Sequence, residues 1–280
     1  MDKPKTIKQK VAGVIINAFL IVLALFQIFP IATMFLNTLR TDSQIKEMPI
    51  GFPTQLYFKN YVETWVRGGY FTAFCNSILV GVATIVIVMT VCGLAGYAIV
   101  KLKLPKKEFF TGYFMLVMSL PSFLYIVPNY FLFHQLNLVN NLAGIIILYA
   151  AGAIPFNLLL IRTFLIGIPK ELEESARVDG CSELRVFLSI TAPLAKPILT
   201  TVALLVFVST WNEFLFANTF LTDDNIRTVA TRFVKFTGEW TRDLAKIFTA
   251  GSITMMPIII LYLFLQKTFI EGMTTGSLKG

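Results

Sequence analysis

The chain has 280 residues, of which 56% are hydrophobic and only 14% are charged. A water-soluble domain of this length carries about a quarter charged residues, so the composition excludes that class and predicts a protein that crosses a membrane several times. The net charge of +8 would suit nucleic acid, but the basic residues flank apolar segments instead of gathering on a polar domain, so we expect no nucleic-acid partner.

The first apolar segment lies at 11–39 and follows a start rich in lysine. It is longer than the core of a signal peptide and no clear cleavage site follows it, so we expect a retained first transmembrane helix within residues 1–36. The next segment, 37–69, is mixed in charge. We interpret it as an external loop with a short amphipathic piece near 59–65.

Five further apolar segments predict five further spans, and we expect an all-α fold of six transmembrane helices. The third segment contains Pro121 and Pro128, which leave carbonyls unpaired at membrane depth. Either a kink or a break that faces a wet cavity would accommodate them. We assign the core of five further spans to 70–266 and a C-terminal tail to 267–280. The expected spans of the core lie near 72–98, 109–133, 142–162, 197–221 and 247–266.

Six spans place both termini on one side of the membrane. Of the 24 Lys and Arg, fifteen lie on that side and nine on the other. The positive-inside rule therefore predicts that both termini are cytoplasmic.

The main charged segment of the second half is 169–193, and its residues predict two short helices joined by a sharp turn. Pro169 suits a first helical position, and the acidic residues after it suit a first turn. Glu173 and Arg177 are spaced to form an ion pair. Gly180 would end the first helix in a left-handed conformation, and Ser182 would cap the second.

The spacing of this segment resembles the EAA loop of ABC importer permeases. That pattern is Glu-Ala-Ala, three residues, Gly, nine residues, Ile, one residue, Leu-Pro, and every spacing is kept. Ser175 replaces an Ala, and Ala192 replaces the Leu. An amphipathic hairpin that rests on the membrane surface is the alternative. The resemblance assigns ATPase coupling to Glu174, Ser175, Ala176, Asp179, Gly180, Ile190 and Pro193.

Three further stretches resemble the carbohydrate branch of that family, in its maltose and multiple-sugar division. They are Pro155-Phe156-Asn157 through Asp179-Gly180, then Trp211-Asn212-Glu213-Phe214-Leu215, and the ending from Gly272 to Gly280. The ending is similar to that of the second permease subunit of the division.

The resemblance implies an assembly in a prokaryotic plasma or inner membrane. A homologous second permease would complete the pore, and two ATPase subunits would each receive one hairpin in a surface cleft. An extracytoplasmic sugar-binding protein would dock outside. The chain has no G-x-x-x-x-G-K-[ST] motif, so ATP and Mg would be bound by the partner ATPase, and we expect no catalysis, no cofactor and no metal in this chain. Cys75, Cys92, Cys181 and the single His134 give no pattern for a disulfide or a metal.

The sequence also offers candidates for other contacts. Trp211, Asn212 and Glu213 resemble a sugar-contacting set. The alternative is that Glu213 is a structural carboxylate that bonds a neighbouring helix. The polar loop 222–246 could be a solvated connection or a probe that enters the binding protein. The tip of that probe would be Phe236, Thr237, Gly238, Glu239 and Trp240. By resemblance, the tail residues that would touch the ATPases are Gly276, Ser277, Leu278 and Lys279.

Three alternatives stay open at this point. The first is an importer of the same class for sn-glycerol 3-phosphate or another polar solute. The second is an ion-coupled secondary transporter, which the lack of a visible inverted repeat and the few membrane carboxylates disfavour. The third is a membrane enzyme, disfavoured because no nucleophile–base or metal constellation is apparent.

Overall fold

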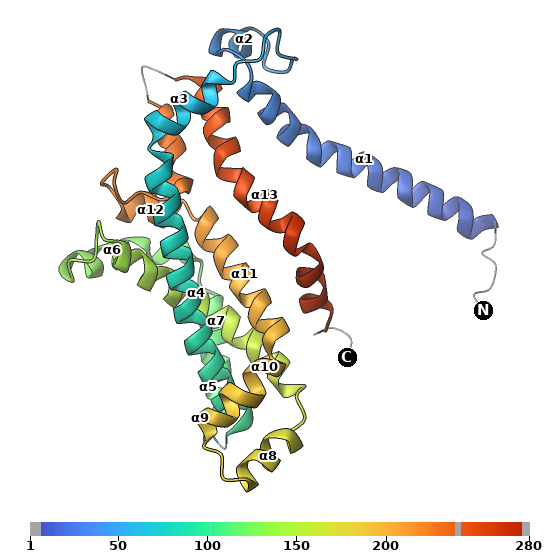
Figure 1. Ribbon diagram of the computed structural model, residues 1–280, viewed down its shortest axis with the longest axis vertical. Helices are drawn as coiled ribbons and strands as arrows, with labels where there is room; N and C mark the ends of the chain where they lie inside the picture. The colour runs from blue at the N-terminus through green and yellow to red at the C-terminus, as the bar shows by residue number, and fades with distance from the viewer. Residues whose placement is uncertain (1–6, 103, 239–241, 276–280) are drawn as a thin grey trace. The chain divides into compact units, whose positions relative to one another are not determined.

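A computed structural model describes residues 7–102, 104–238 and 242–275, and every regular element in these ranges is a helix (Figure 1). Within the described residues, four helices are long and apolar enough to cross a membrane, and the number rises to six if each of two bent helix pairs counts as one span. The all-α prediction is confirmed. In chain order the elements are α1 (Ile7–Thr38), α2 (Asp42–Glu47), α3 (Lys59–Gly68), α4 (Tyr70–Lys101), α5 (Lys107–Met118), η1 (Ser122–Tyr125), α6 (Ile126–Gln135), α7 (Leu142–Ile166), α8 (Glu171–Val178), α9 (Glu183–Val186), the π-helix η2 (Phe187–Thr191), α10 (Ala192–Leu194), α11 (Lys196–Asn212), α12 (Leu215–Phe220), η3 (Val229–Phe236) and α13 (Leu244–Thr275).

The chain divides into two compact units, one formed by Met1–Gly68 and Phe233–Met256, the other by Gly69–Arg232 and Pro257–Gly280. In the first unit, Thr41 and the side chain of Gln44 form a reciprocal capping box that starts α2. The next residue, Asp42, accepts a hydrogen bond from the backbone N–H of Leu244 at 2.7 Å and so caps α13. The segment 37–69 is thus more ordered than the expected loop, because α2 precedes the predicted amphipathic piece, which is α3.

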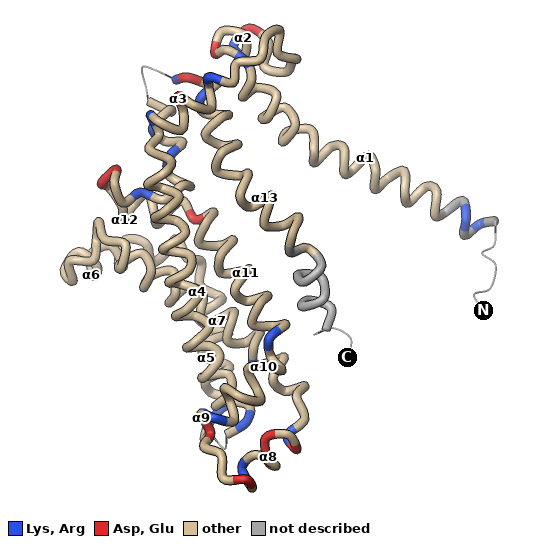
Figure 2. Tube along the Cα trace, in the orientation of Figure 1, with Lys and Arg blue, Asp and Glu red and all other residues tan. Residues whose placement is uncertain are grey.

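Three long helices form the centre of the second unit. α4 packs along α7 and α11 (Figure 1), and glycines allow the close approach. A methyl group on Gly96 would lie 3.2 Å from Ile161 Cγ2, and one on Gly81 would lie 3.0 Å from the Phe207 ring. Between their ends these helices carry almost no charge, whereas charged residues concentrate around α8 and α9 (Figure 2).

The expected third span is broken. α5 and the η1–α6 segment meet at an angle of 88°. Pro121 is the residue before η1 and lies at the break, while Pro128 lies in the first turn of α6, where its missing N–H is not needed. Of the two expected ways to accommodate the prolines, a kink or a break, the structure has a break, because the helix stops at Met118 and resumes at Ser122.

The fifth expected span is also interrupted. α11 ends at Asn212, and after Glu213 and Phe214 the short helix α12 continues the chain. At its other end, α11 follows the α9–η2–α10 segment at a bend of 80°. The last helix, α13, continues beyond the expected span into the part that we assigned to the tail.

Candidate functional site

The charged segment folds as the predicted hairpin, with α8 as its first limb. After α8 the N–H of Gly180 donates to the carbonyl of Arg177 at 3.1 Å, and the N–H of Cys181 donates to the carbonyl of Ala176 at 3.0 Å. This pair of bonds is a Schellman motif, and it needs a left-handed residue at its centre. Gly180 takes that role with φ of +79°. Pro169, in contrast, lies outside α8, which begins at Glu171.

α8 has a buried face and an exposed face. Glu173 and Ala176 are buried, and Ala176 belongs to the core cluster that also contains Tyr97 of α4 and Leu165 of α7. Glu174 is exposed, and the side chain of Val178 is 88% exposed. The exposed face of α8 therefore presents a carboxylate and an apolar side chain one helical turn apart.

A buried ion pair joins the hairpin to α4. Lys101 Nζ lies 3.2 Å from Glu173 Oε1, and each side chain is only 1% exposed. The same ammonium donates to the carbonyl of Ile168 at 2.8 Å, and the Thr191 hydroxyl donates to Glu173 Oε1 at 3.0 Å. The pair is therefore surrounded by further hydrogen bonds, as a buried charge requires.

A second cluster lies beside it and is partly exposed. Arg177 Nε donates to Glu183 Oε1 at 2.7 Å, and the Tyr97 hydroxyl donates to Glu183 Oε2, also at 2.7 Å. The hydrogen bond from Arg177 lowers the pKa of Glu183 below its usual value, and the bond from Tyr97 lowers it further by a smaller amount. The same bond to Glu183 raises the pKa of Arg177. The predicted Glu173–Arg177 pair is present at a longer 3.8 Å.

The seven predicted coupling residues have different environments. Glu174, Ser175, Asp179, Gly180 and Pro193 are exposed, whereas Ala176 is buried and Ile190 is half-buried against the core. The Ser175 hydroxyl donates to the carbonyl of Glu171 at 2.9 Å, so the departure from Ala is accommodated on the surface of α8. Pro193 lies in α10, which ends at Leu194, and the chain bends by 80° before α11 begins at Lys196.

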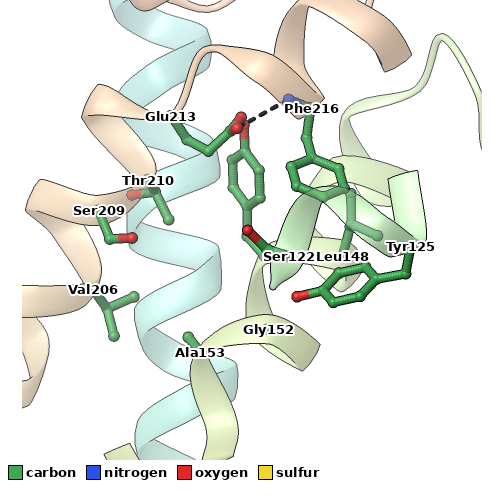
Figure 3. A pocket seen from close by; sticks show the side chains of 11 residues that line it. Ser122, Tyr125, Leu148, Gly152, Ala153, Val206, Ser209, Thr210, Glu213 and Phe216 are labelled. Carbon is green, nitrogen blue, oxygen red and sulfur yellow. Dashed lines mark hydrogen bonds between the residues drawn. The ribbon is translucent and has the colours of Figure 1, made fainter. Parts of the chain in front are cut away.

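A cavity of about 230 Å³ lies between α7, α11 and the break that precedes η1 (Figure 3). Ser122 and Tyr125 of η1 contribute hydroxyl groups to the lining, and so do Ser209 and Thr210 of α11. Apolar side chains complete its wall. The remaining lining residues are Leu148, Tyr149, Gly152, Ala153, Val206, Glu213 and Phe216.

Glu213 is the one acid that lines this cavity. Its carboxylate accepts hydrogen bonds from the backbone N–H groups of Phe216 at 2.9 Å and Ala217 at 3.0 Å, in the first turn of α12 (Figure 3). It also accepts a bond from the Tyr149 hydroxyl of α7. These contacts match the alternative in which Glu213 is a structural carboxylate, although the residue still faces the cavity.

The predicted set Trp211, Asn212 and Glu213 is not brought together. Trp211 is buried, and its ring meets those of Phe74 at 5.4 Å and Phe207 at 5.6 Å. Asn212 is exposed, and neither residue lines the cavity. Consecutive residues at the end of a helix point in different directions, so adjacency in sequence did not make a site.

The predicted tip of the loop is described only in part. Phe236 ends η3 and is buried, and Gly238 is exposed. Glu239 and Trp240 lie outside the described residues, as do Gly276, Ser277, Leu278 and Lys279 of the tail. Phe236 thus has the environment of an anchor for the loop.

The sequence did not indicate several residues that build these sites. Lys101 and Tyr97 are far from the hairpin along the chain, and no local pattern relates either residue to it. Tyr149 lies in an uninterrupted apolar segment. Only Val178 could have been noticed from the sequence, because it is an apolar residue that does not lie on the same side of α8 as the buried Ala176.

Comparisons with known proteins place these features in context. Residues 93–275 match the family described as binding-protein-dependent transport system inner membrane component. The chain is 33% identical over 279 residues to the probable ABC transporter permease protein YurM of Bacillus subtilis, with coverage of 100% of this chain and 92% of that protein. It is 31% identical over 230 residues to the melibiose/raffinose/stachyose import permease protein MelC of the same organism, with coverage of 82% and 83%.

Two further likenesses extend over nearly the whole chain. The diacetylchitobiose uptake system permease protein DasC of Streptomyces coelicolor is 27% identical over 265 residues, which cover 94% of this chain and 96% of that protein. A crystal structure of a bacterial ABC transporter involved in the import of the acidic polysaccharide alginate contains a chain of similar fold. The TM-score is 0.82 at 22% identity, with coverage of 96% of this chain and 100% of that one.

Proposed function

Because the chain belongs to the family of binding-protein-dependent transport system inner membrane components, we propose that it is one of two permease subunits of an ATP-driven sugar importer. It forms half of the translocation pore, and a homologous second permease forms the other half. Two ATPase subunits bind ATP and Mg and supply the energy. An extracytoplasmic sugar-binding protein delivers the substrate.

The observation that carries this proposal is the hairpin at 169–193. Its Gly180 turn and its exposed Glu174 and Val178 form a polar and apolar surface outside the apolar helices, while its other face is packed into the core. Such a projection suits docking into a cleft of an ATPase subunit. Closure of the ATPases would then move the hairpins and switch the pore between its inward-facing and outward-facing states.

The orientation of the chain follows from its charge. The side with the hairpin and both termini carries the larger share of Lys and Arg, so this side is cytoplasmic. The loop 222–246 then faces outward and reaches the binding protein, with Phe236 as its anchor and the following residues as its tip. The tail from Gly276 reaches the ATPases on the inner side.

The cavity beside Glu213 is our candidate for part of the substrate path. Hydroxyl groups from Ser122, Tyr125, Ser209 and Thr210 can exchange hydrogen bonds with the hydroxyls of a sugar. Among the residues that line it, Glu213 is the only charged group, and its negative charge disfavours sn-glycerol 3-phosphate. The relatives named for oligosaccharide uptake support a sugar as the substrate.

Uptake in membrane vesicles tests this proposal. Vesicles with the full complex would be given its binding protein and radiolabelled melibiose, raffinose or diacetylchitobiose. We expect uptake of a sugar that requires ATP and survives an uncoupler. Uptake that ignores ATP and collapses with the uncoupler would instead identify an ion-coupled carrier.

A further inference from the structure

Two adjacent glutamates of α8 have opposite environments. Glu174 is exposed, but the side chain of Glu173 is 1% exposed and lies against Lys101, which is buried to the same extent. A lone charge at this depth would be strongly disfavoured, and even a well-bonded pair adds little stability over an apolar pair of similar volume. Stability alone therefore does not account for an ion pair at this position.

The pair connects four segments of the chain at one point. Lys101 is the last residue of α4, and its ammonium also holds the carbonyl of Ile168, directly after α7. Glu173 belongs to α8, and its carboxylate accepts the Thr191 hydroxyl from the end of the π-helix η2. The Lys101 ammonium thus joins α8 to the ends of α4 and α7, the two long helices that pack most closely together, and the Thr191 hydroxyl joins the second limb of the hairpin to α8.

α7 leads from this point to the cavity. Its residues Tyr149, Gly152 and Ala153 line the cavity, and Ile168 follows its C-terminal end. The distance along α7 from Ala153 to its last residue, Ile166, is about 20 Å at the rise of an α-helix. A displacement of α8 would therefore move Glu173, and the short contacts of Lys101 with Glu173 and with the Ile168 carbonyl would carry that displacement to α4 and α7 together.

We propose that the Lys101–Glu173 ion pair, with the Ile168 carbonyl and the Thr191 hydroxyl, is the joint that transmits motion of the hairpin to α4 and α7. The inference rests on the proposed function, because it assumes that an ATPase moves the hairpin. Glu174 and Val178 contact the ATPase, whereas Lys101 and Glu173 are positioning residues that touch neither ATPase nor sugar. Without the joint, the hairpin still docks, but its motion is lost before it reaches the cavity.

The test compares the number of sugar molecules imported per ATP hydrolysed by the purified complex in proteoliposomes. It uses whichever of melibiose, raffinose or diacetylchitobiose the parental complex transports. Lys101→Met removes the ion pair and the bond to Ile168, Lys101→Arg keeps the charge and the donors, and Glu108→Gln is the matched control. Glu108 pairs with Arg162 at 3.9 Å and is 73% exposed, so this pair should contribute little.

We expect Lys101→Met to lower the import per ATP at least about five-fold, at the lower end of typical coupling between sites. Lys101→Arg and Glu108→Gln should stay near the parental ratio. A merely structural role would reduce the amount of complex, and import and hydrolysis would fall together at an unchanged ratio. That unchanged ratio would overturn the proposal.

A second variant is needed in case Lys101→Met folds poorly, because that substitution removes the buried cation from beside the Glu173 carboxylate. Lys101→Met/Glu173→Leu removes both charges and should fold, since apolar pairs replace buried ion pairs well. It also lacks the bonds to Ile168 and Thr191, so we expect the same low ratio, and a parental ratio would overturn the joint. If the parental complex itself imports none of the three sugars with ATP, the proposed sugar function fails instead.

Discussion

The turn at Gly180 allows a specific prediction, because the left-handed backbone conformation is the only feature there that requires a glycine. Gly180 has φ of +79°, and a Cβ added there would meet no heavy atom within 4 Å. Gly180→Val therefore introduces no clash, and its effect comes from the backbone conformation alone. A β-branched residue held in the left-handed region costs about 1–3 kcal/mol, which corresponds to a roughly 5- to 150-fold smaller population of the native turn.

We expect Gly180→Val to insert into the membrane and to lower ATP-driven sugar uptake by a factor within that range, because the ATPase meets a hairpin of altered shape. Gly180→Asn is the matched control, since Asn tolerates the left-handed region, and it should retain most of the activity. Uptake and ATP hydrolysis would be measured in proteoliposomes at equal amounts of inserted protein. Normal uptake by Gly180→Val, or an equal loss in Gly180→Asn, would refute the reasoning from backbone conformation.

Three further predictions concern other parts of the chain. Tyr149→Phe removes the hydroxyl that bonds Glu213 across two membrane helices, and we expect it to destabilise the purified protein by about 0.6–2 kcal/mol, seen as a lower melting temperature; an unchanged melting temperature would mean that the bond contributes nothing. The pKa of Glu183 is lowered by Arg177, so its contribution to stability is full above its ordinary pKa of 4.5 and is lost as the pH falls through the lower pKa of the folded state. Glu183→Gln should therefore melt below the parental protein at pH 7 and approach it in acid, whereas a constant difference would contradict the ionic role. Deletion of Ser277–Gly280 should lower the ATP hydrolysis that the sugar-loaded binding protein stimulates, and unchanged turnover would indicate that the tail is dispensable.

The hairpin could be predicted because its signals are local. An acidic first turn, an i,i+4 pair and a glycine at the end of a helix each act within a few residues, and the family assignment from the EAA spacing is confirmed by the match over 93–275. Lys101 could not be assigned to Glu173 in this way, because only the packing of α4 beside α7 and α8 brings the two side chains together.

The membrane part was predictable in type but not in detail. Pro121 indicated that the helix of the third segment could be interrupted. The angle of 88° between α5 and the η1–α6 segment could not be predicted, because it depends on how these helices pack against their neighbours. At the end of α11, the sequence indicated a carboxylate that needs a partner. It could not indicate that Tyr149 and the first turn of α12 provide the partners, nor that Trp211 packs between Phe74 and Phe207.

Site-specific photo-cross-linking tests most directly whether the hairpin is the contact with an ATPase. A photoreactive amino acid would replace Val178, which is 88% exposed on α8, and in a separate variant Phe52, which is 83% exposed in the segment between α2 and α3. In membranes that contain the whole complex, we predict that the photoreactive group at position 178 forms a covalent product with the ATPase subunit. The yield of this product should change when ATP is trapped in the complex. The group at position 52 should form no such product. A product with the ATPase from position 52 and none from position 178 would contradict both the docking role of the hairpin and the proposed orientation of the chain.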